Sequence, residues 1–320
     1  MKLKNLIFKL SIIFFSLFFL IIFFEFALRI MGLGNPLLYK TNLSYRYYPK
    51  PNQNIERFGN KIIINNLALR TNDDWLEKDN NKTKIIFFGD SVTYGGSFLN
   101  NENLFSSLVC AELNLKNNSY KCGNAGVNGY GSDNINNRII YGDLDSDIYI
   151  ITLIGDSSFR SLVNIGSTPS HSELPKYLPA LKEFTYWILW RVMMNLRQND
   201  WWFKGHIDQN YNIAKLSLNN LKNTLNNIVK NEKKKVFVIL HPNKDQLSPI
   251  NNLNKKILLI KYDLLKDEFM KKENYFEVIN LEEEIKKLNL SNIYYDDVHL
   301  SKDGHKFFSE QILKLIKQKP

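Results

Sequence analysis

The sequence contains little cysteine and little arginine, and each shortage argues against a class of function. Only two of its 320 residues are cysteines, Cys110 and Cys122, and no Cys-x-x-Cys pair or Cys/His cluster is present. We therefore expect no zinc site, no redox centre and no other cofactor. The net charge of +10 comes from lysines scattered in twos and threes, without an arginine-rich helix. That pattern argues against nucleic-acid binding, although the chain is basic.

Disorder and repeats are also missing. Apolar residues make up 44% of the chain and aromatic residues 13%, which is ample for a packed core. No internal repeat is visible, and the length fits one large domain or two small ones.

The first 32 residues form an apolar segment without a signal-peptidase site. No charge occurs from Leu10 to Phe24, and the apolar stretch from Leu6 to about Met31 is long enough for a bilayer. Bulky residues occupy the positions where a cleavable signal peptide needs small ones, so an uncleaved single-pass anchor over 1–32 is favoured over a cleaved signal. Lysines precede the span and few basic residues follow it. We therefore expect a cytoplasmic N-terminus and an extracytoplasmic or periplasmic remainder.

This outward placement bears on the two cysteines. In an oxidising compartment Cys110 and Cys122 can form one disulfide that closes a short loop. Two unpaired buried thiols are the alternative, and the sequence does not decide between them.

Residues 83–320 alternate between strand and helix patterns. They follow a polar lead-in over 33–82, in which a hairpin is expected near 61–64. Apolar runs predict strands at 84–88, 119–124, 147–154, 235–240 and 276–281. Helical patterns occupy 98–114, 133–142, 211–231, 252–272 and 304–317. The alternation predicts an α/β fold, a three-layer α/β/α domain with a five-stranded, mostly parallel sheet, preceded by a transmembrane helix.

Residues 157–209 interrupt this alternation as an aromatic-rich insertion. They contain the apolar stretch 181–190 and the aromatic triplet 201–203. A helix packed on the core is one interpretation. A lid, a substrate wall or a membrane-contacting patch is the other, since aromatic side chains favour interfaces.

Two distant motifs carry the chemistry. Gly89-Asp90-Ser91 follows the first predicted strand, in a turn that exposes the serine at a strand's carboxyl end, where open α/β sheets bind ligands. Asp296 and His299 lie just before the last helix. Histidine can take a proton from a serine hydroxyl near neutral pH, and it works best when a carboxylate orients it. The alternatives are an ordinary turn for the first motif and a helix-capping segment for the second.

Together these motifs resemble those of SGNH/GDSL serine hydrolases, which pair an early Gly-Asp-Ser with a C-terminal Asp-x-x-His. The segment 124–129, Asn-Ala-Gly-Val-Asn-Gly, is similar to the second block of that family, and 65–70, Asn-Asn-Leu-Ala-Leu-Arg, to a stretch that precedes the domain in membrane-anchored members. The resemblance covers about residues 60–318. It implies a flavodoxin-like SGNH fold with Ser91 as nucleophile, His299 as base and Asp296 as its partner, and an oxyanion site formed by the N–H groups of Ser91 and Gly129.

One position departs from the family pattern. Gly155 occupies the place of an asparagine that donates to the oxyanion in the family, and Leu153 the place of a glycine. Loss of one such donor typically lowers the rate by about 10²–10³. Gly155 remains a further candidate for the oxyanion site, and Ser157 or another polar group is a candidate replacement.

Other candidates are weaker. Asp143, Asp145 and Asp147 lack the glycine and glutamate of a calcium loop, so no metal site is expected there. His241, at the end of the fourth strand, is expected either to contact substrate or to serve a structural role. His305 is assigned to the last helix, and His171 and His206 lack metal-ligand spacing.

The resemblance implies an esterase, that is, an O-acyl or O-acetyl hydrolase. An O-acyltransferase acting on envelope glycan and a non-catalytic glycan-binding protein of envelope assembly are the alternatives. With the anchor, it favours an acylated glycan or a lipid ester of the cell envelope as substrate, and membrane contact through the N-terminal helix.

Overall fold

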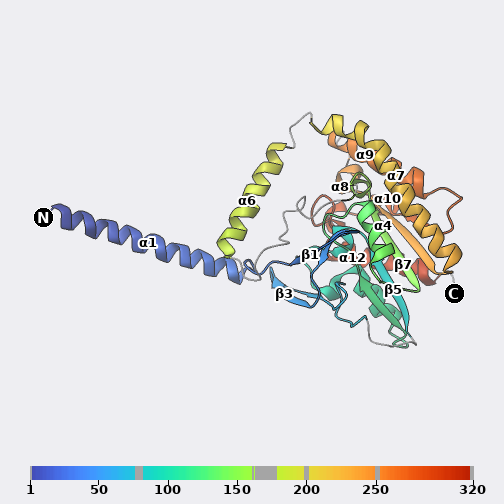
Figure 1. Ribbon diagram of the computed structural model, residues 1–320, viewed down its shortest axis with the longest axis horizontal. Coiled ribbons are helices and arrows are strands. Elements are labelled where there is room, and N and C mark those ends of the chain that lie inside the picture. Colours follow the sequence, from blue (N-terminus) through green and yellow to red (C-terminus); the bar gives the residue numbers. More distant parts are fainter. Residues whose placement is uncertain are drawn as a thin grey trace.

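The computed structural model describes residues 2–75, 82–160, 162, 179–197, 202–248 and 253–317. A long helix, α1 (Lys2–Ile30), projects from a mixed α/β body (Figure 1). Its apolar part, Lys4–Ile30, has 27 residues, and no residue of its most apolar stretch is buried against the rest of the protein. At 1.5 Å per residue this is about 40 Å, enough to cross a bilayer. Length and composition alone fit an anchor and a signal sequence equally well.

Two antiparallel hairpins follow α1. The first pairs β1 (Tyr39–Asn42) with β2 (Arg46–Pro49), and the second pairs β3 (Gln53–Arg57) with β4 (Asn60–Ile64). The second is the hairpin expected near 61–64, whereas the first was not predicted. Their buried aromatic and aliphatic side chains join the main core, so the lead-in is more ordered than its polar composition indicated.

A five-stranded sheet forms the centre of the body. Its order is β6-β5-β7-β8-β9, and every neighbouring pair is parallel. The strands are β5 (Thr83–Phe88), β6 (Tyr120–Asn124), β7 (Ile148–Ile154), β8 (Lys235–His241) and β9 (Glu277–Asn280). They agree with the predicted runs to within about one residue at each end, and the predicted α/β/α architecture is confirmed.

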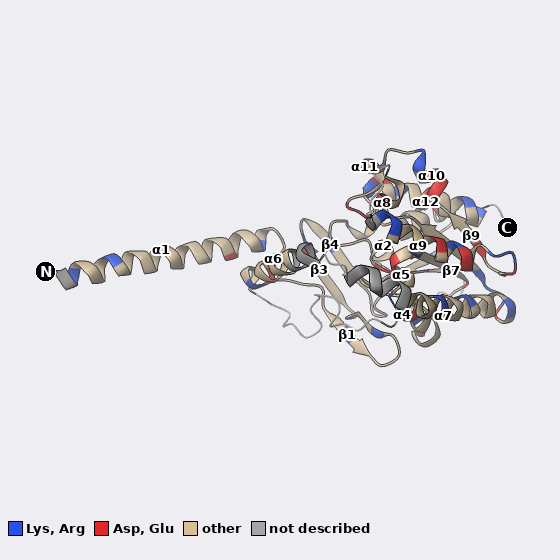
Figure 2. Ribbon diagram, turned by 90° about the horizontal axis from the view of Figure 1, so that it is seen from above, with Lys and Arg blue, Asp and Glu red and all other residues tan. Residues whose placement is uncertain are grey.

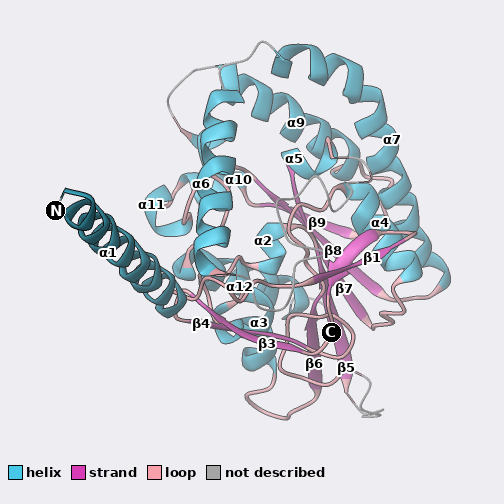
Figure 3. Cartoon of the chain, turned by 60° about the vertical axis from the view of Figure 1, so that its left-hand side comes forward, coloured by secondary structure: helices cyan, strands magenta, loops and turns pink. Residues whose placement is uncertain are grey.

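Helices cover both faces of this sheet, as Figure 3 shows. Because successive strand residues point to opposite faces, Ile85 and Phe87 join one apolar cluster while Ile86 and Phe88 join another. The first cluster includes side chains of α3 (Phe105–Leu113) and α12 (Lys302–Lys317). The second includes side chains of α4 (Ser132–Tyr141), α7 (Trp202–Asn231) and α9 (Leu253–Phe269).

Two predicted helix boundaries differ from the structure. The helix expected at 98–114 begins only at Phe105, after a short 3₁₀ turn, η1 (Asn101–Asn103). The preceding residues are drawn away from helical geometry because Arg70 donates hydrogen bonds to the carbonyl oxygens of Gly96 and Leu99. The helix expected at 211–231 begins at Trp202, so Trp202 and Phe203 of the aromatic triplet belong to α7, and residue 201 lies outside the described residues.

The remaining described elements are short, apart from α6 (Ala180–Arg197), which lies within the aromatic-rich insertion. The short helices are α2 (Ser91–Tyr94), α5 (Gly155–Ser158), α8 (Lys244–Leu247), α10 (Glu282–Lys286) and α11 (Leu290–Ile293). A disulfide between Cys110 and Cys122 joins α3 to β6, which decides between the two alternatives left open by the sequence.

Candidate active site

Ser91 is the first residue of α2, directly beyond the carboxyl end of β5. Asp90 caps this short helix, because its Oδ1 accepts the N–H of Val92 at 2.9 Å. Gly89 has no room for a side chain: an added Cβ would lie 2.1 Å from Oγ1 of Thr93 and 2.9 Å from the carbonyl oxygen of Thr152. The Gly-Asp-Ser sequence therefore forms a tightly packed turn that presents Ser91 at the edge of the sheet.

The C-terminal motif meets this serine. Nε2 of His299 lies 2.9 Å from Oγ of Ser91, and Nδ1 of His299 lies 2.7 Å from Oδ2 of Asp296. The other carboxylate oxygen of Asp296 accepts the backbone N–H groups of Val298 at 2.9 Å and of His299 at 2.7 Å. Residues separated by more than 200 positions thus form one continuous chain of hydrogen bonds.

The electrostatics of Asp296 fit its place in that chain. Burial by itself raises the pKa of the Asp296 carboxyl, but the hydrogen bond and charge of His299, with the N–H groups of Val298 and His299, lower that pKa to about 2. Asp296 is therefore a carboxylate at any pH near neutrality. An ionised carboxylate accepts a hydrogen bond from the N–H at Nδ1 of His299. Nε2 is then the unprotonated ring nitrogen, which can accept a hydrogen bond from the hydroxyl of Ser91.

The loop after β6 lies against α2. The N–H of Val127 donates to the carbonyl oxygen of Gly89 at 3.2 Å, and a Cβ on Gly126 would lie 2.4 Å from the backbone nitrogen of Tyr94. Gly129 follows in this loop with a φ of 80°, in the left-handed region that favours glycine. The structure thus brings the second sequence block beside the turn that carries Ser91.

Gly155 lies at the start of α5, beyond β7, and its surroundings explain the absence of a side chain. A Cβ there would lie 3.0 Å from the backbone nitrogen of Tyr262 and 3.2 Å from the carbonyl carbon of Lys261, both in α9. The side-chain direction at this position is thus toward α9. The hydroxyl of Ser157 donates to the carbonyl oxygen of Ile154 at 2.7 Å. Its proton is therefore already used and is not available to replace the missing asparagine as an oxyanion donor.

A cation near the nucleophile was missed by the sequence reasoning. Arg160 lies with Nη1 3.6 Å from Oδ2 of the buried Asp90. Burial raises the pKa of Asp90, and the charge of Arg160 partly offsets that rise. No motif marks Arg160, because it follows α5 in a loop that the sequence gives no reason to single out.

Aromatic rings flank the histidine. Phe98 stacks on Tyr295 with ring centroids 4.0 Å apart, and its ring lies 6.1 Å from that of His299, edge to face. The side chain of Tyr295 is 62% exposed. This pair forms an apolar wall beside the hydrogen-bonded chain, and only its proximity in the folded structure reveals it.

Arg70 supports the segment after α2. Its buried guanidinium donates to the carbonyl oxygens of Tyr94, Gly96 and Leu99, and to Oδ1 of Asn101. Arg70 thereby holds the loop that leads away from Ser91.

Two other histidines are fully buried and serve the fold. Nε2 of His241 lies 3.1 Å from the carbonyl oxygen of Val298, the residue before His299. Nδ1 of His305 accepts the N–H of Phe105 at 3.1 Å. Burial lowers the pKa of His241 to about 4 and that of His305 to about 3. For His241 the structure favours the structural alternative over substrate contact, and His305 lies in α12 as expected.

Two candidates fall outside this description. His171 lies outside the described residues, and the side chain of His206 is likewise not described. Among the described residues, no group of His, Cys, Asp and Glu side chains is suited to hold a metal ion.

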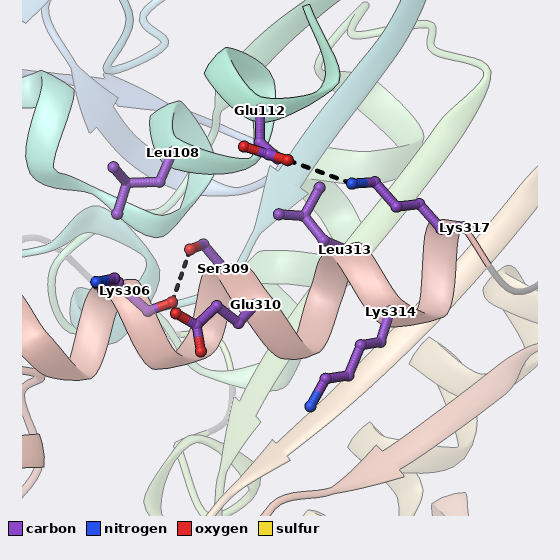
Figure 4. Close-up of a pocket in the computed structure, with 8 residues that line it drawn as sticks. All are labelled: Leu108, Glu112, Lys306, Ser309, Glu310, Leu313, Lys314 and Lys317. Carbon is purple, nitrogen blue, oxygen red and sulfur yellow. Dashed lines mark hydrogen bonds and ion pairs between the residues drawn. The ribbon is translucent and has the colours of Figure 1, made fainter. Parts of the chain in front are cut away.

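A groove of about 800 Å³ between α3 and α12 lies apart from Ser91, Asp296 and His299 (Figure 4). Its rim carries several long charged side chains, and Glu112 pairs with Lys317 across it. None of Ser91, Asp296 and His299 lines it, so it contributes no group to the chemistry described above.

No family model and no curated protein matches the sequence. Among solved structures, the chain is similar to the acetyl xylan esterase AlAXEase, with 15% identity and a TM-score of 0.45, over 73% of this chain and 99% of the other. It is also similar to a lipolytic protein of the G-D-S-L family from Veillonella parvula, with 13% identity and a TM-score of 0.44, over 73% of this chain and 98% of the other. A lipase/acylhydrolase from Enterococcus faecalis is similar with 17% identity and a TM-score of 0.44, over 74% of this chain and 96% of the other.

Proposed function

We propose that this protein is a serine-dependent ester hydrolase of the SGNH/GDSL type, with Ser91 as nucleophile, His299 as general base and Asp296 as its orienting carboxylate. The observation that carries the proposal is the chain of hydrogen bonds from Asp296 through His299 to Ser91, with distances of 2.7 and 2.9 Å. Nucleophile, base and orienting group within hydrogen-bond reach are the signature of covalent catalysis by serine.

In the proposed reaction, Nε2 of His299 takes the proton from Oγ of Ser91 as that oxygen attacks the ester carbonyl carbon. The tetrahedral intermediate collapses, the carbon–oxygen bond to the alcohol breaks, and the imidazolium returns its proton to the leaving oxygen. Water, or a sugar hydroxyl, then attacks the acyl-enzyme with the same histidine as base. Asp296 stabilises the imidazolium and fixes its tautomer throughout.

The negative oxygen of the intermediate needs donors. Ser91 begins a helix, and the first N–H groups of a helix have no partner within it, so the N–H of Ser91 is the first proposed donor. Gly129 is the second, because its loop packs against the Ser91 turn and its positive φ reverses the chain there. The N–H of Gly155 is a further candidate, whereas a side chain at 155 points toward α9.

We further propose that α1 anchors the enzyme, with its N-terminus in the cytoplasm and the α/β domain outside. The apolar run of α1 and its N-terminal lysines support this orientation. Figure 2 shows α2, which begins with Ser91, within the α/β body that α1 would hold at the membrane surface. An ester carried by an envelope glycan or by a lipid suits this position, and the Phe98 and Tyr295 rings offer apolar contact for an acyl group or a sugar ring.

Hydrolysis of p-nitrophenyl acetate by the full-length protein in detergent tests the proposal. Ser91→Ala should lower kcat/KM by about 10⁴-fold or more. Ser97→Ala is the matched control, since Ser97 follows in the same loop without contact to His299, and it should retain activity. If the wild-type protein turns over neither this ester nor acetylated glycans, the proposal fails in favour of a glycan-binding protein.

A further inference from the structure

Helix α6 exposes several large apolar side chains in its middle turns. Tyr186, Trp187 and Leu189 are each more than half exposed, Val192 is 50% exposed and Ile188 is 40% exposed. Soluble domains seldom leave so many large apolar side chains of one helix in water unless they bind something. Within the described part of the insertion, the start of α6 packs against Leu28 and Leu33, at the end of α1, and not on the main core.

That first turn is fixed to the end of α1. The two carboxylate oxygens of Glu25, in α1, accept the backbone N–H groups of Ala180 and Leu181, each at 2.9 Å. A carboxylate that binds the first N–H groups of a helix both caps it and favours its dipole. Leu28 and Leu33 pack against Ala180 at the same place.

A second carboxylate fixes the same turn from the other side. Glu183 is only 4% exposed, and its oxygens accept the N–H of Gly34 at 2.7 Å and the guanidinium of Arg57 at 2.5 Å. Gly34 follows α1, and Arg57 ends β3. Because buried ion pairs require good geometry to offset desolvation, these contacts define where α6 starts and in which direction it leaves.

The resulting direction is crosswise to α1. In Figures 1 and 3, α6 starts at the end of α1 and runs across the axis of that helix, on the side of the α/β body nearest to it. The junction lies at Glu25 and Arg29, where the uncharged run of α1 ends. If α1 spans a bilayer, its charged end lies at the headgroup level, and α6 therefore runs along the membrane surface.

We propose that α6 is an interfacial helix whose exposed apolar side chains insert into the outer leaflet of the bilayer that α1 spans. This inference rests on the proposed anchoring by α1. Tyrosine and tryptophan favour the headgroup level, and a helix with bulky apolar residues binds there in the plane of the interface. The exposed Lys182 in its first turn suits lipid phosphates.

The bilayer is a better occupant of this surface than a second protein chain. The exposed apolar surface of α1 extends to Ile30 and Met31, which are 72% and 56% exposed, next to the start of α6. The two apolar surfaces are thus continuous, and a lipid phase that surrounds the first reaches the second.

Depth-dependent fluorescence quenching tests the inference on the full-length protein in phosphatidylcholine–phosphatidylglycerol vesicles. An environment-sensitive fluorophore is attached to single cysteines at Trp187→Cys and, as a second α6 variant, Leu189→Cys. The native cysteines do not compete, since Cys110 and Cys122 form a disulfide. Phe18→Cys in α1 reports anchoring. Leu115→Cys, two residues after the end of α3, is the exposed control outside α1 and α6.

With quenchers attached to shallow positions of the lipids, the labels at 187 and 189 should lose about half of their emission or more, as expected for side chains at the headgroup level. The label at 18 should respond to deep quenchers, and the label at 115 to neither. If the α6 labels behave like the label at 115 while the label at 18 is quenched, α6 does not contact the bilayer and this inference alone fails. If the label at 18 is also unquenched, the anchoring fails and this inference with it.

Discussion

Nδ1 of His299 and Oδ2 of Asp296 lie 2.7 Å apart, within a loop turn that the same carboxylate closes by accepting two backbone N–H groups. Asp296 therefore both builds the loop and orients the base. Asp296→Asn preserves the shape of the side chain but removes its charge and its preference for the productive tautomer, so kcat on p-nitrophenyl acetate should fall by about 10⁴-fold.

Asp297 provides the matched control for that experiment. It is the next residue, and its carboxylate makes no hydrogen bond to His299 in the described structure. Asp297→Asn should leave kcat within a few-fold of wild type. Equal losses in the two variants would show that the loop needs negative charge in general, and they would contradict the role assigned to Asp296.

His241 also holds the loop that carries His299, because its Nε2 contacts the carbonyl oxygen of Val298. His241→Leu leaves this partly buried carbonyl oxygen without its donor, which should lower the free energy of unfolding by about 1 kcal/mol and lower kcat more than it raises KM. His241→Gln retains a donor and should restore part of kcat. If both variants lose stability equally but keep the wild-type kcat, His241 does not position His299.

The buried histidines predict a loss of stability in mild acid. In the folded protein the pKa values of His241 and His305 lie at about 4 and 3, whereas an unfolded histidine titrates near 6.5. Below pH 6.5 the unfolded state therefore binds more protons, and stability falls as the pH falls. The loss approaches about 1.4 kcal/mol per pH unit for each histidine.

Urea unfolding in detergent at pH 6.5 and pH 5 measures this effect, which should amount to about 3 kcal/mol for the two groups together, because unfolded histidines are already half protonated at pH 6.5. His305→Gln, whose amide oxygen can still accept the N–H of Phe105, should reduce the loss by about half. A stability that is unchanged between the two pH values would mean that neither histidine is held neutral by burial.

Gly155→Asn tests why the family asparagine is absent. Because the side-chain direction at 155 meets the backbone of Lys261 and Tyr262, an asparagine there must displace α9. We expect a lower free energy of unfolding and no gain in kcat. A rise in kcat of about tenfold or more, as a recovered oxyanion donor would give, would show that the side chain reaches the site.

The sequence predicts the sheet well because its strands are short, almost uninterrupted apolar runs, as in 148–154, and strands buried on both faces have that pattern. It predicts Ser91, Asp296 and His299 because each lies in a local motif, and their meeting follows from the topology of a parallel sheet, whose strand ends share one edge. The sequence does not decide whether Cys110 and Cys122 form a disulfide or stay as free thiols, since spacing alone does not fix a pairing.

The features that were missed depend on contacts between distant segments. Arg160 and the Phe98–Tyr295 stack belong to no motif, and only their distances from Asp90 and His299 mark them. The late start of α3 follows from hydrogen bonds to Arg70, about thirty positions earlier. The direction of α6 depends on Glu25 and on Arg57, and no local pattern encodes either contact.

Reaction with a fluorophosphonate, followed by mass spectrometry of the modified peptide, tests the central claim most directly. Such reagents phosphonylate a serine only when a neighbouring base activates its oxygen. The account predicts stoichiometric modification of Ser91 in the full-length protein and loss of labelling in His299→Gln. Absence of modification at Ser91 in folded protein, or modification that persists in His299→Gln at the wild-type rate, would contradict it.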